Sequence, residues 1–328
     1  HAGRSERRFG QERGSQRRNA RMAGKKWDRG AKSDSGRRHL ILRAVTAIMT
    51  TLMRAATPMA ADAPIGVFDS GIGGLSVLRH IRTCLPQEAL LYFSDARYAP
   101  YGGQPEQHIE QRALAIGALL VARPVKALVV ACNSATAVAI AALRRAYPTL
   151  VVVGVEPGLK PAAAISTTRV VGVMATEATL ASARFAQLRM TLSTATGVTF
   201  LTMACPGLAH RIEQDQMHLP ESMALLRSFV LPLLEQGADT LVLGCTHYPF
   251  VQQQIQSIVD EQAARSVTII DTGAAVARQL ASQLNLQGLL RRESAPSVDG
   301  LSSGNATDLE RAFRRLLGLT VRVAQADK

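Results

Sequence analysis

The sequence predicts an α/β protein with two similar domains, each a mostly parallel sheet flanked by helices. Short apolar runs of strand length alternate with helical patterns from about Pro64 onward, which is typical of parallel sheets with helices on both faces. Two of these runs, residues 127–131 and 240–244, share one design, because each stops at a cysteine (Cys132 or Cys245) that precedes small polar residues and a helical pattern. The length of 328 residues suits two domains of ordinary size. Since ligands bind at the carboxyl ends of parallel strands, we expect the active site in the cleft between the domains.

Residues 1–63 are predicted to form a basic, disordered leader. Residues 1–62 contain 15 Lys or Arg and 5 Asp or Glu, so the rest of the chain carries only +3 of the formal charge of +13. A segment rich in Arg, Gly, Ser and Gln cannot bury enough apolar surface to order itself. Arg43 and Arg54 interrupt the apolar residues 40–60, so no membrane span is expected. An amphipathic leader helix fits these residues as well as a signal peptide does, but export would carry reactive thiols into an oxidising space.

The first domain is predicted to comprise residues 64–156 and 267–328. It opens with a strand at 65–68, a glycine turn at 70–74 and a helix at 75–84. After a second strand, residues 95–103 form a loop rich in Pro, Gly and Tyr. The other elements expected here are strands at 89–94, 127–131, 151–155 and 267–270, and helices at 106–122, 134–147, from 271 and at 308–317. Residues 288–306 are polar and contain Gly, Ser and Pro, which predicts a loop.

The second domain is predicted to comprise residues 157–266. Glu156-Pro157-Gly158 interrupts the secondary structure and marks the crossing between the domains. Its expected strands lie at 170–174, 198–202 and 240–244, and its expected helices start at 176 and cover 221–235. It therefore repeats the organisation of the first domain.

The glycine turn Ser70-Gly71-Ile72-Gly73-Gly74 indicates a site for a small carboxylate. Its backbone N–H groups can approach an anion at the start of the following helix. No Gly-Lys-Ser/Thr follows, as a Walker loop requires, and Ser76 occupies the place of the third glycine of a dinucleotide fingerprint. A nucleotide phosphate is therefore not the expected ligand.

The four cysteines favour free thiols in the cytoplasm. They show no Cys-X-X-Cys pairing and no disulfide-scaffold density. The spacing of Cys132, Cys245 and His247 matches no common structural zinc site, so no metal is predicted. We interpret Cys84 as a buried, inert residue and Cys205 as structural.

Two thiols at equivalent positions suit the transfer of a proton from one face of a carbon to the other. A cysteine at a strand end, close to the start of a helix, is expected to have a lowered pKa. Abstraction of a proton next to a carboxylate needs a base with a pKa near the working pH and a site that excludes water. Asp69 and His247 also directly follow strands, so each can orient one thiol.

The lysines indicate that pyridoxal phosphate is not needed. Beyond residue 63 they are Lys126, Lys160 and Lys328. Lys126 opens a strand at the end away from the thiol, Lys328 is the last residue, and no phosphate-binding cup accompanies Lys160. A cofactor-independent reaction is therefore predicted.

Four motifs together resemble the bacterial glutamate racemase family. They are Asp69-Ser70-Gly71-Ile72-Gly73-Gly74-Leu75, Pro100-Tyr101-Gly102, Ala131-Cys132-Asn133-Ser134-Ala135-Thr136 and Gly244-Cys245-Thr246-His247-Tyr248-Pro249. The resemblance runs from about Pro64 to the helix near Leu317, and the motifs keep the family's order and separation. It implies cofactor-independent interconversion of L-glutamate and D-glutamate in the cytoplasm, which supplies D-glutamate for peptidoglycan. It is also compatible with a homodimer and with activation by a peptidoglycan precursor.

The resemblance also implies roles for single residues. Cys132 corresponds to the base for D-glutamate and Cys245 to the base for L-glutamate, with Asp69 and His247 as further catalytic residues. Glu177 corresponds to a further acidic catalytic residue near the His247 side. Ser134 stands where the family often has Thr, which keeps the hydroxyl. The implied substrate contacts are Asp69, Ser70, Tyr101, Gly102, Asn133, Ser134, Thr136, Thr246 and His247.

Two other functions fit part of the sequence. Racemases for aspartate or hydantoins share the two-thiol architecture but generally lack the full set of motifs. A regulatory protein that binds nucleic acid or a topoisomerase through its basic arm would use the leader and leave the pocket idle. The paired thiols with Asp69 and His247 favour the enzyme, and neither a membrane nor nucleic acid is an expected partner.

Overall fold

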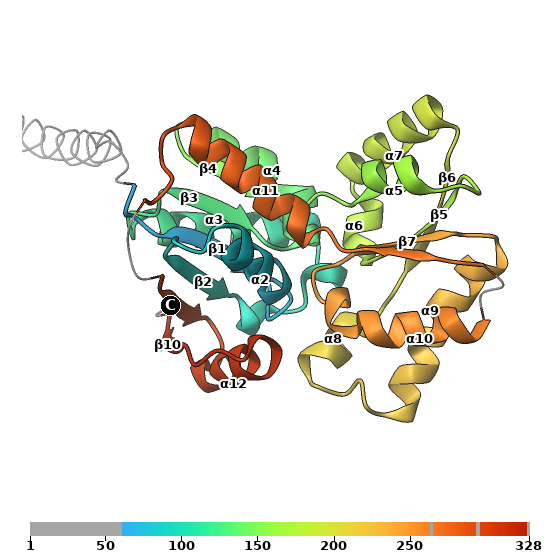
Figure 1. Cartoon of the computed structure of the whole chain (residues 1–328). Coiled ribbons are helices and arrows are strands. Elements are labelled where there is room, and N and C mark those ends of the chain that lie inside the picture. The colour runs from blue at the N-terminus through green and yellow to red at the C-terminus, as the bar shows by residue number, and fades with distance from the viewer. Residues whose placement is uncertain (1–60, 263–264, 293–295, 327–328) are drawn as a thin grey trace, which may run out of the picture. The chain divides into compact units, whose positions relative to one another are not determined.

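The computed structural model describes residues 61–262, 265–292 and 296–326, so nearly all of the predicted leader lies outside the described residues. In these residues ten strands form two separate sheets in which every strand pair is parallel (Figure 1). The predicted α/β class is therefore confirmed. The residues that the structure describes belong to one compact unit, and the division into two domains stays a proposal.

The first sheet has six strands in the spatial order β10-β9-β2-β1-β3-β4. Their bounds are β1 (Ile65–Asp69), β2 (Leu90–Ser94), β3 (Ala127–Val130), β4 (Val151–Gly154), β9 (Val298–Ser302) and β10 (Arg322–Gln325). The second sheet has four strands in the order β6-β5-β7-β8. Their bounds are β5 (Val170–Ala175), β6 (Thr199–Ala204), β7 (Thr240–Gly244) and β8 (Thr268–Ile270).

The helices occupy most of the connections between strands. The α-helices are α2 (Leu75–Cys84), α3 (Glu106–Val121), α4 (Asn133–Ala146), α5 (Leu159–Ile165), α6 (Glu177–Ala181), α7 (Ala183–Thr196), α8 (Leu208–Glu213), α9 (Pro220–Glu235), α10 (Gln252–Gln262), α11 (Gly273–Leu286) and α12 (Ala306–Leu317). Three short 3₁₀ turns are η1 (Ala96–Tyr98), η2 (Tyr101–Gly103) and η3 (Tyr248–Val251). None of the helices in the described part of the chain is long and apolar enough to cross a membrane.

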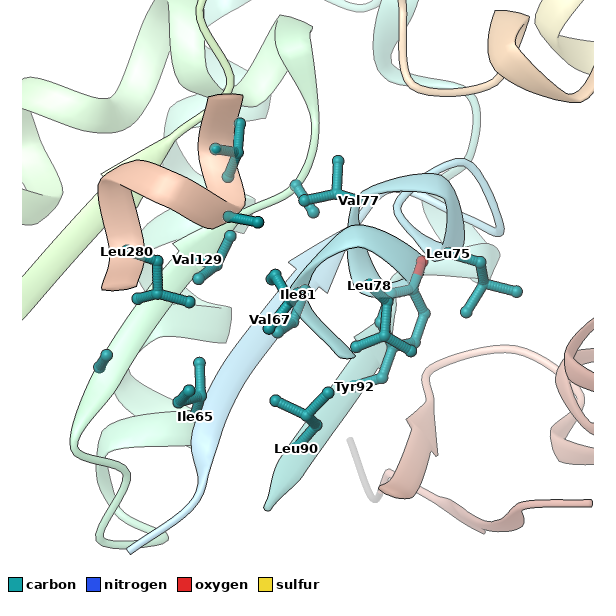
Figure 2. Packing of buried hydrophobic residues seen from close by; sticks show 14 of the residues in the cluster. Ile65, Val67, Leu75, Val77, Leu78, Ile81, Leu90, Tyr92, Val129 and Leu280 are labelled. Carbon is teal, nitrogen blue, oxygen red and sulfur yellow. The ribbon is translucent and has the colours of Figure 1, made fainter. Parts of the chain in front are cut away.

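The first sheet is buried on both faces, which explains why its central strands are apolar throughout. On one face Leu75, Leu78 and Ile81 of α2, spaced three residues apart, pack on β1 and β2, and Leu280 of α11 joins them (Figure 2). On the other face Phe68 packs with apolar residues of α3 and α4. A parallel strand that is covered on both faces is apolar along its length. In β1 the apolar residues run from Ile65 to Phe68, and the polar Asp69 comes only at the carboxyl end.

The second sheet repeats this arrangement around β7. Leu241 and Leu243 face the residues of α9 and α10, whereas Val242 faces α5 and α7. Each sheet therefore has a fully buried strand with a cysteine just after its end. Cys245 directly follows β7, and Ala131 alone separates Cys132 from β3. The fold places both thiols at carboxyl ends of strands, where α/β proteins bind ligands.

Two predictions about the chain's course were wrong. Residues 268–270 pair with β7 in the second sheet and not with the first, so the return to the first sheet comes after Ile270, where α11 packs against α2. The predicted loop at 288–306 contains β9, which pairs with β2 along its whole length. Its sequence Val-Asp-Gly-Leu-Ser has little strand character, so the pairing with a neighbouring strand overrides local propensity.

Candidate active site

Cys132 caps the start of α4 and is almost fully buried. Its sulfur accepts a hydrogen bond from the backbone N–H of Ala135 at 3.5 Å, and its thiol donates to the Ser70 hydroxyl at 4.0 Å. Burial raises the pKa of Cys132 well above its ordinary value, and the charge of Asp69 raises it further. The expectation that the helix start lowers this pKa was therefore wrong, because one backbone N–H does not compensate for desolvation.

Asp69 stands at the end of β1 with only half of its carboxylate occupied. Oδ2 accepts a hydrogen bond from Gly74 N–H at 2.7 Å, whereas Oδ1 is buried and has no partner among the described residues. Burial raises the pKa of Asp69, although the nearby charge of His247 works in the opposite direction. The free oxygen gives this half of the site an unused acceptor.

Cys245 begins a relay of three side chains. Its sulfur lies 3.6 Å from Nδ1 of His247, and Nε2 of His247 lies 2.7 Å from Oε1 of Glu213. Burial alone would lower the pKa of His247, but the hydrogen bonds and charges of Cys245 and Glu213 raise it well above its ordinary value. Burial likewise opposes ionisation of Glu213, yet its contacts with His247 leave the pKa of this carboxyl lowered. His247 and Glu213 therefore form an ion pair behind the thiol, with His247 buried and Glu213 partly buried.

The glycine turn joins the two halves of the site. Oε1 of Glu213 accepts the N–H of Ile72 at 2.8 Å, and the hydroxyl of Ser76 donates to the carbonyl of Thr246 at 2.8 Å. A Cβ added to Gly73 would overlap the His247 ring and come within 2.7 Å of the Thr246 hydroxyl. Two of the turn's N–H groups, those of Ile72 and Gly74, donate to protein carboxylates, Glu213 and Asp69, so a site for a small carboxylate ligand at this turn stays a prediction.

Several of the predicted substrate contacts lie near Cys132, whereas the hydroxyls of two others bond to the protein. Both side-chain amide atoms of Asn133 are buried without a partner among the described residues, and Ser134 lies 3.0 Å from the Thr176 hydroxyl. Gly102 is packed so tightly that an added Cβ would lie 2.9 Å from Thr176. These positions adjoin Cys132 or its helix, and their contact with a substrate stays a prediction.

Thr136 and Tyr101 differ from this prediction. The Thr136 hydroxyl donates to the Val130 carbonyl at 3.1 Å and accepts the Val155 N–H at 3.0 Å. The Tyr101 hydroxyl donates to Asp95 at 2.5 Å. Since both hydroxyls are committed to the protein, Thr136 holds β3 against the segment after β4, and a substrate contact at Tyr101 would involve its backbone.

Glu177, predicted to lie near the His247 side, is not part of the His247 relay. Glu177 is exposed at the first position of α6, which packs against η2 and α4 near Cys132. Both ring nitrogens of His247 are already engaged, by Cys245 and Glu213. Sequence reasoning missed Glu213 because it ends a helix instead of following a strand. The Cys205-Pro206-Gly207 break at the carboxyl end of β6 was the available signal, since it opens the short helix that carries Glu213.

The two thiols are nearly closed to solvent, with 5% and 6% of Cys132 and Cys245 exposed. A cavity of about 690 Å³ approaches the relay from outside and reaches Glu213 and Ile72. Within the described residues no group of three or more His, Cys, Asp or Glu side chains is arranged to hold a metal ion. All four cysteines are free, and Cys84, predicted to be buried, is exposed near the end of α2.

The fold and the paired thiols match an enzyme family. The chain belongs to the Asp/Glu/Hydantoin racemase family, whose match covers residues 65–280. Within the family it is 48% identical over 262 residues to the glutamate racemase of Ectopseudomonas mendocina, an alignment that covers 80% of this chain and 97% of the relative. The predicted relationship to glutamate racemases is confirmed.

Solved structures agree with the sequence relatives. A glutamate racemase isoform from Bacillus anthracis superimposes with a TM-score of 0.72 at 31% identity, covering 81% of this chain and 97% of the other. The Escherichia coli glutamate racemase, solved in complex with L-glutamate and the activator UDP-MurNAc-Ala, gives a TM-score of 0.69 at 29% identity, with 80% and 97% coverage.

Proposed function

We propose that this chain interconverts L-glutamate and D-glutamate by a two-base proton transfer between Cys245 and Cys132. The observation that carries the proposal is the pair of buried cysteines at the carboxyl ends of β3 and β7, each with an ionisable neighbour from a strand end. The near full-length similarity to glutamate racemases supports glutamate as the substrate.

In the direction from L- to D-glutamate, the Cys245 thiolate takes the α-proton. The C–H bond breaks, an S–H bond forms, and the electron pair left on the α-carbon is shared with the adjoining carboxylate. The Cys132 thiol then gives its proton to the opposite face of the carbon and becomes a thiolate. The raised pKa of Cys132 fits this role, because the thiol is protonated at neutral pH.

His247 and Glu213 support the Cys245 half of the reaction. The raised pKa of His247 keeps the ring protonated, and Nδ1 lies 3.6 Å from the sulfur. It can therefore donate a hydrogen bond to the sulfur while the sulfur carries negative charge. Asp69 supports the Cys132 half, and its free oxygen with the amide of Asn133 can bind the polar groups around the α-carbon.

The positions of the lysines support a reaction without pyridoxal phosphate. Nζ of Lys126 is ion-paired with Glu88 and donates to the Leu289 carbonyl, at the amino end of β3 and away from Cys132. Lys160 is exposed at the start of α5. We therefore assign the proton transfer to cysteine side chains.

Closure of the site implies that it must open for glutamate to enter. Asp69 and His247 are 0% and 3% exposed, and exclusion of water protects a carbanion once the site has closed. Contacts such as Ser76 to Thr246 are the ones that must break and re-form. The role of D-glutamate in cytoplasmic peptidoglycan synthesis, and activation by UDP-MurNAc-Ala as named for the E. coli structure, belong to the same proposal.

Circular dichroism of each glutamate enantiomer with the purified full chain tests the function. We expect the signal to decay to zero from either side, at a rate that UDP-MurNAc-Ala raises, while aspartate and a hydantoin give no comparable decay. Decay with aspartate alone would replace glutamate as the substrate. Deleting residues 1–60 tests the alternative of a basic binding arm. The enzyme proposal predicts unchanged turnover of glutamate after the deletion, and a loss of turnover would contradict the expectation that these residues are not needed for the reaction.

A further inference from the structure

The segment that carries Glu213 ends in an unusual backbone conformation. Helix α8 stops at Glu213, and Asp215 has a φ of 58°. The N–H of Gln216 bonds to the Arg211 carbonyl at 2.8 Å and the N–H of Asp215 to the Ile212 carbonyl at 3.2 Å, which is the pattern of a Schellman helix end. Helices usually have glycine at this left-handed position, and aspartate is among the other residues that adopt it.

The side chain of Asp215 forms an ion pair with another part of the molecule. Oδ2 of Asp215 lies 2.8 Å from Nη1 of Arg315. Arg315 belongs to α12, which packs on β9, β10 and α2 of the first sheet. Two residues earlier, Glu213 contacts the same side of the molecule through the N–H of Ile72. The end of α8 is thus attached at two points to elements of the first sheet.

Arg315 also acts on Glu213 through its charge. Burial raises the pKa of Glu213, but the contacts with His247 and the N–H of Ile72 lower it. The positive charge of Arg315 makes a smaller contribution that also lowers this pKa. Both residues line the 690 Å³ cavity outside the relay. The other titratable side chains that line it are His210 on α8, Asp215 just after α8, and Asp308 and Arg311 on α12. Arg311 pairs with Asp308 of its own helix, so Arg315 is the arginine of this cavity that reaches across to α8.

We propose that Arg315 is a positioning residue for the Cys245 half of the site, which holds Glu213 on His247 through its ion pair with Asp215. The inference rests on the proposed function, because it assigns Arg315 a part in the same proton transfer. The Asp215 and Arg315 side chains are 67% and 34% exposed, and a pair this exposed adds little to folding stability. Its effect therefore falls on the placement of Glu213 and not on folding, and small misplacements of catalytic groups are costly to rate.

The test compares Arg315→Gln with Arg311→Gln, a matched control on the same helix and in the same cavity. We expect Arg315→Gln to lower kcat/KM for glutamate by about three- to fivefold, the limit that an ion pair this exposed sets, and Arg311→Gln to change it less than about twofold. Arg315→Lys, which keeps the charge, should recover most of the loss. Asp215→Asn should resemble Arg315→Gln, and the double variant should be no worse than either single one, because both remove the same ion pair.

A second readout separates positioning from a general loss of structure. NMR titration of the His247 imidazole in the substrate-free protein should give a lower pKa in Arg315→Gln and Asp215→Asn than in the wild type, and a restored pKa in Arg315→Lys. Equal losses of activity in Arg315→Gln and Arg311→Gln, or an unchanged His247 titration in Arg315→Gln, would overturn the inference. A wild-type protein that does not racemise glutamate would refute the proposed function, whereas the His247 titration would still decide the role of Arg315.

Discussion

Replacing Glu213 with Gln isolates the charge at the outer end of the relay. The amide oxygen of Gln can still accept the Ile72 N–H, but the negative charge opposite the His247 ring is lost. A hydrogen bond to a charged group contributes about 1.5–3 kcal/mol, which corresponds to a loss of about 10- to 150-fold in kcat/KM if the bond acts fully in the transition state. We therefore expect Glu213→Gln to fold normally and to racemise glutamate 10- to 150-fold more slowly, within this estimate.

The assay is circular dichroism with each enantiomer as substrate. Because enantiomers have equal free energies in water, kcat/KM must fall equally in both directions, and this equality checks the measurement. Glu177→Gln, measured in parallel, tests the residue first chosen from the sequence. A larger loss in Glu177→Gln than in Glu213→Gln would refute the assignment of the relay to Glu213.

The free energy of unfolding that Glu213→Gln loses is expected to depend on pH. The pKa of His247 is raised above its ordinary 6.5, so its contribution is complete below that value and is lost as the pH rises through the raised pKa. The pKa of Glu213 is lowered from 4.5, so its contribution is present above 4.5 and is lost as the pH falls through the lowered pKa. Urea unfolding should show the largest stability difference between wild type and Glu213→Gln between these limits. A difference that is independent of pH would contradict the ion pair.

Two further tests use substitutions in the glycine turn and in the core. Gly73→Ala should lower activity at least about tenfold, because its Cβ would overlap the His247 ring, whereas Gly103→Ala, with open space around its Cβ, should be nearly silent in the same assay. Lys126→Met should lower the free energy of unfolding in urea by about 3–5 kcal/mol, because it leaves the buried Glu88 without its ion-pair partner. Adding Glu88→Leu should recover much of that loss. No recovery would indicate that the lysine acts through other contacts.

Much of the fold could be predicted because its central strands are buried on both faces. That burial requires unbroken apolar runs, and the polar residues that end them, such as Asp69 and Cys132, mark the carboxyl ends of strands. The helix at Leu75–Cys84 was predicted with its observed bounds because its apolar residues repeat at helical spacing.

The elements that were missed depend on contacts that a local pattern does not contain. Strand β9 exists because it pairs with β2, and β8 belongs to the second sheet because it pairs with β7. The same holds for the site. Residues at strand ends, such as His247, could be selected from the sequence, but Glu213 reaches the site from a helix end 34 residues away. The pKa of Cys132 was misjudged because burial, which is a tertiary property, outweighs the helix start.

The most direct test of the two-base account is α-proton exchange of each glutamate enantiomer in D₂O, followed by NMR, for wild type, Cys132→Ala and Cys245→Ala. The wild type should exchange and racemise both enantiomers. Cys132→Ala should retain exchange only with L-glutamate, Cys245→Ala only with D-glutamate, and neither should racemise. A variant that still racemises, or that exchanges both enantiomers, would contradict the assignment of one thiol to each face of the substrate.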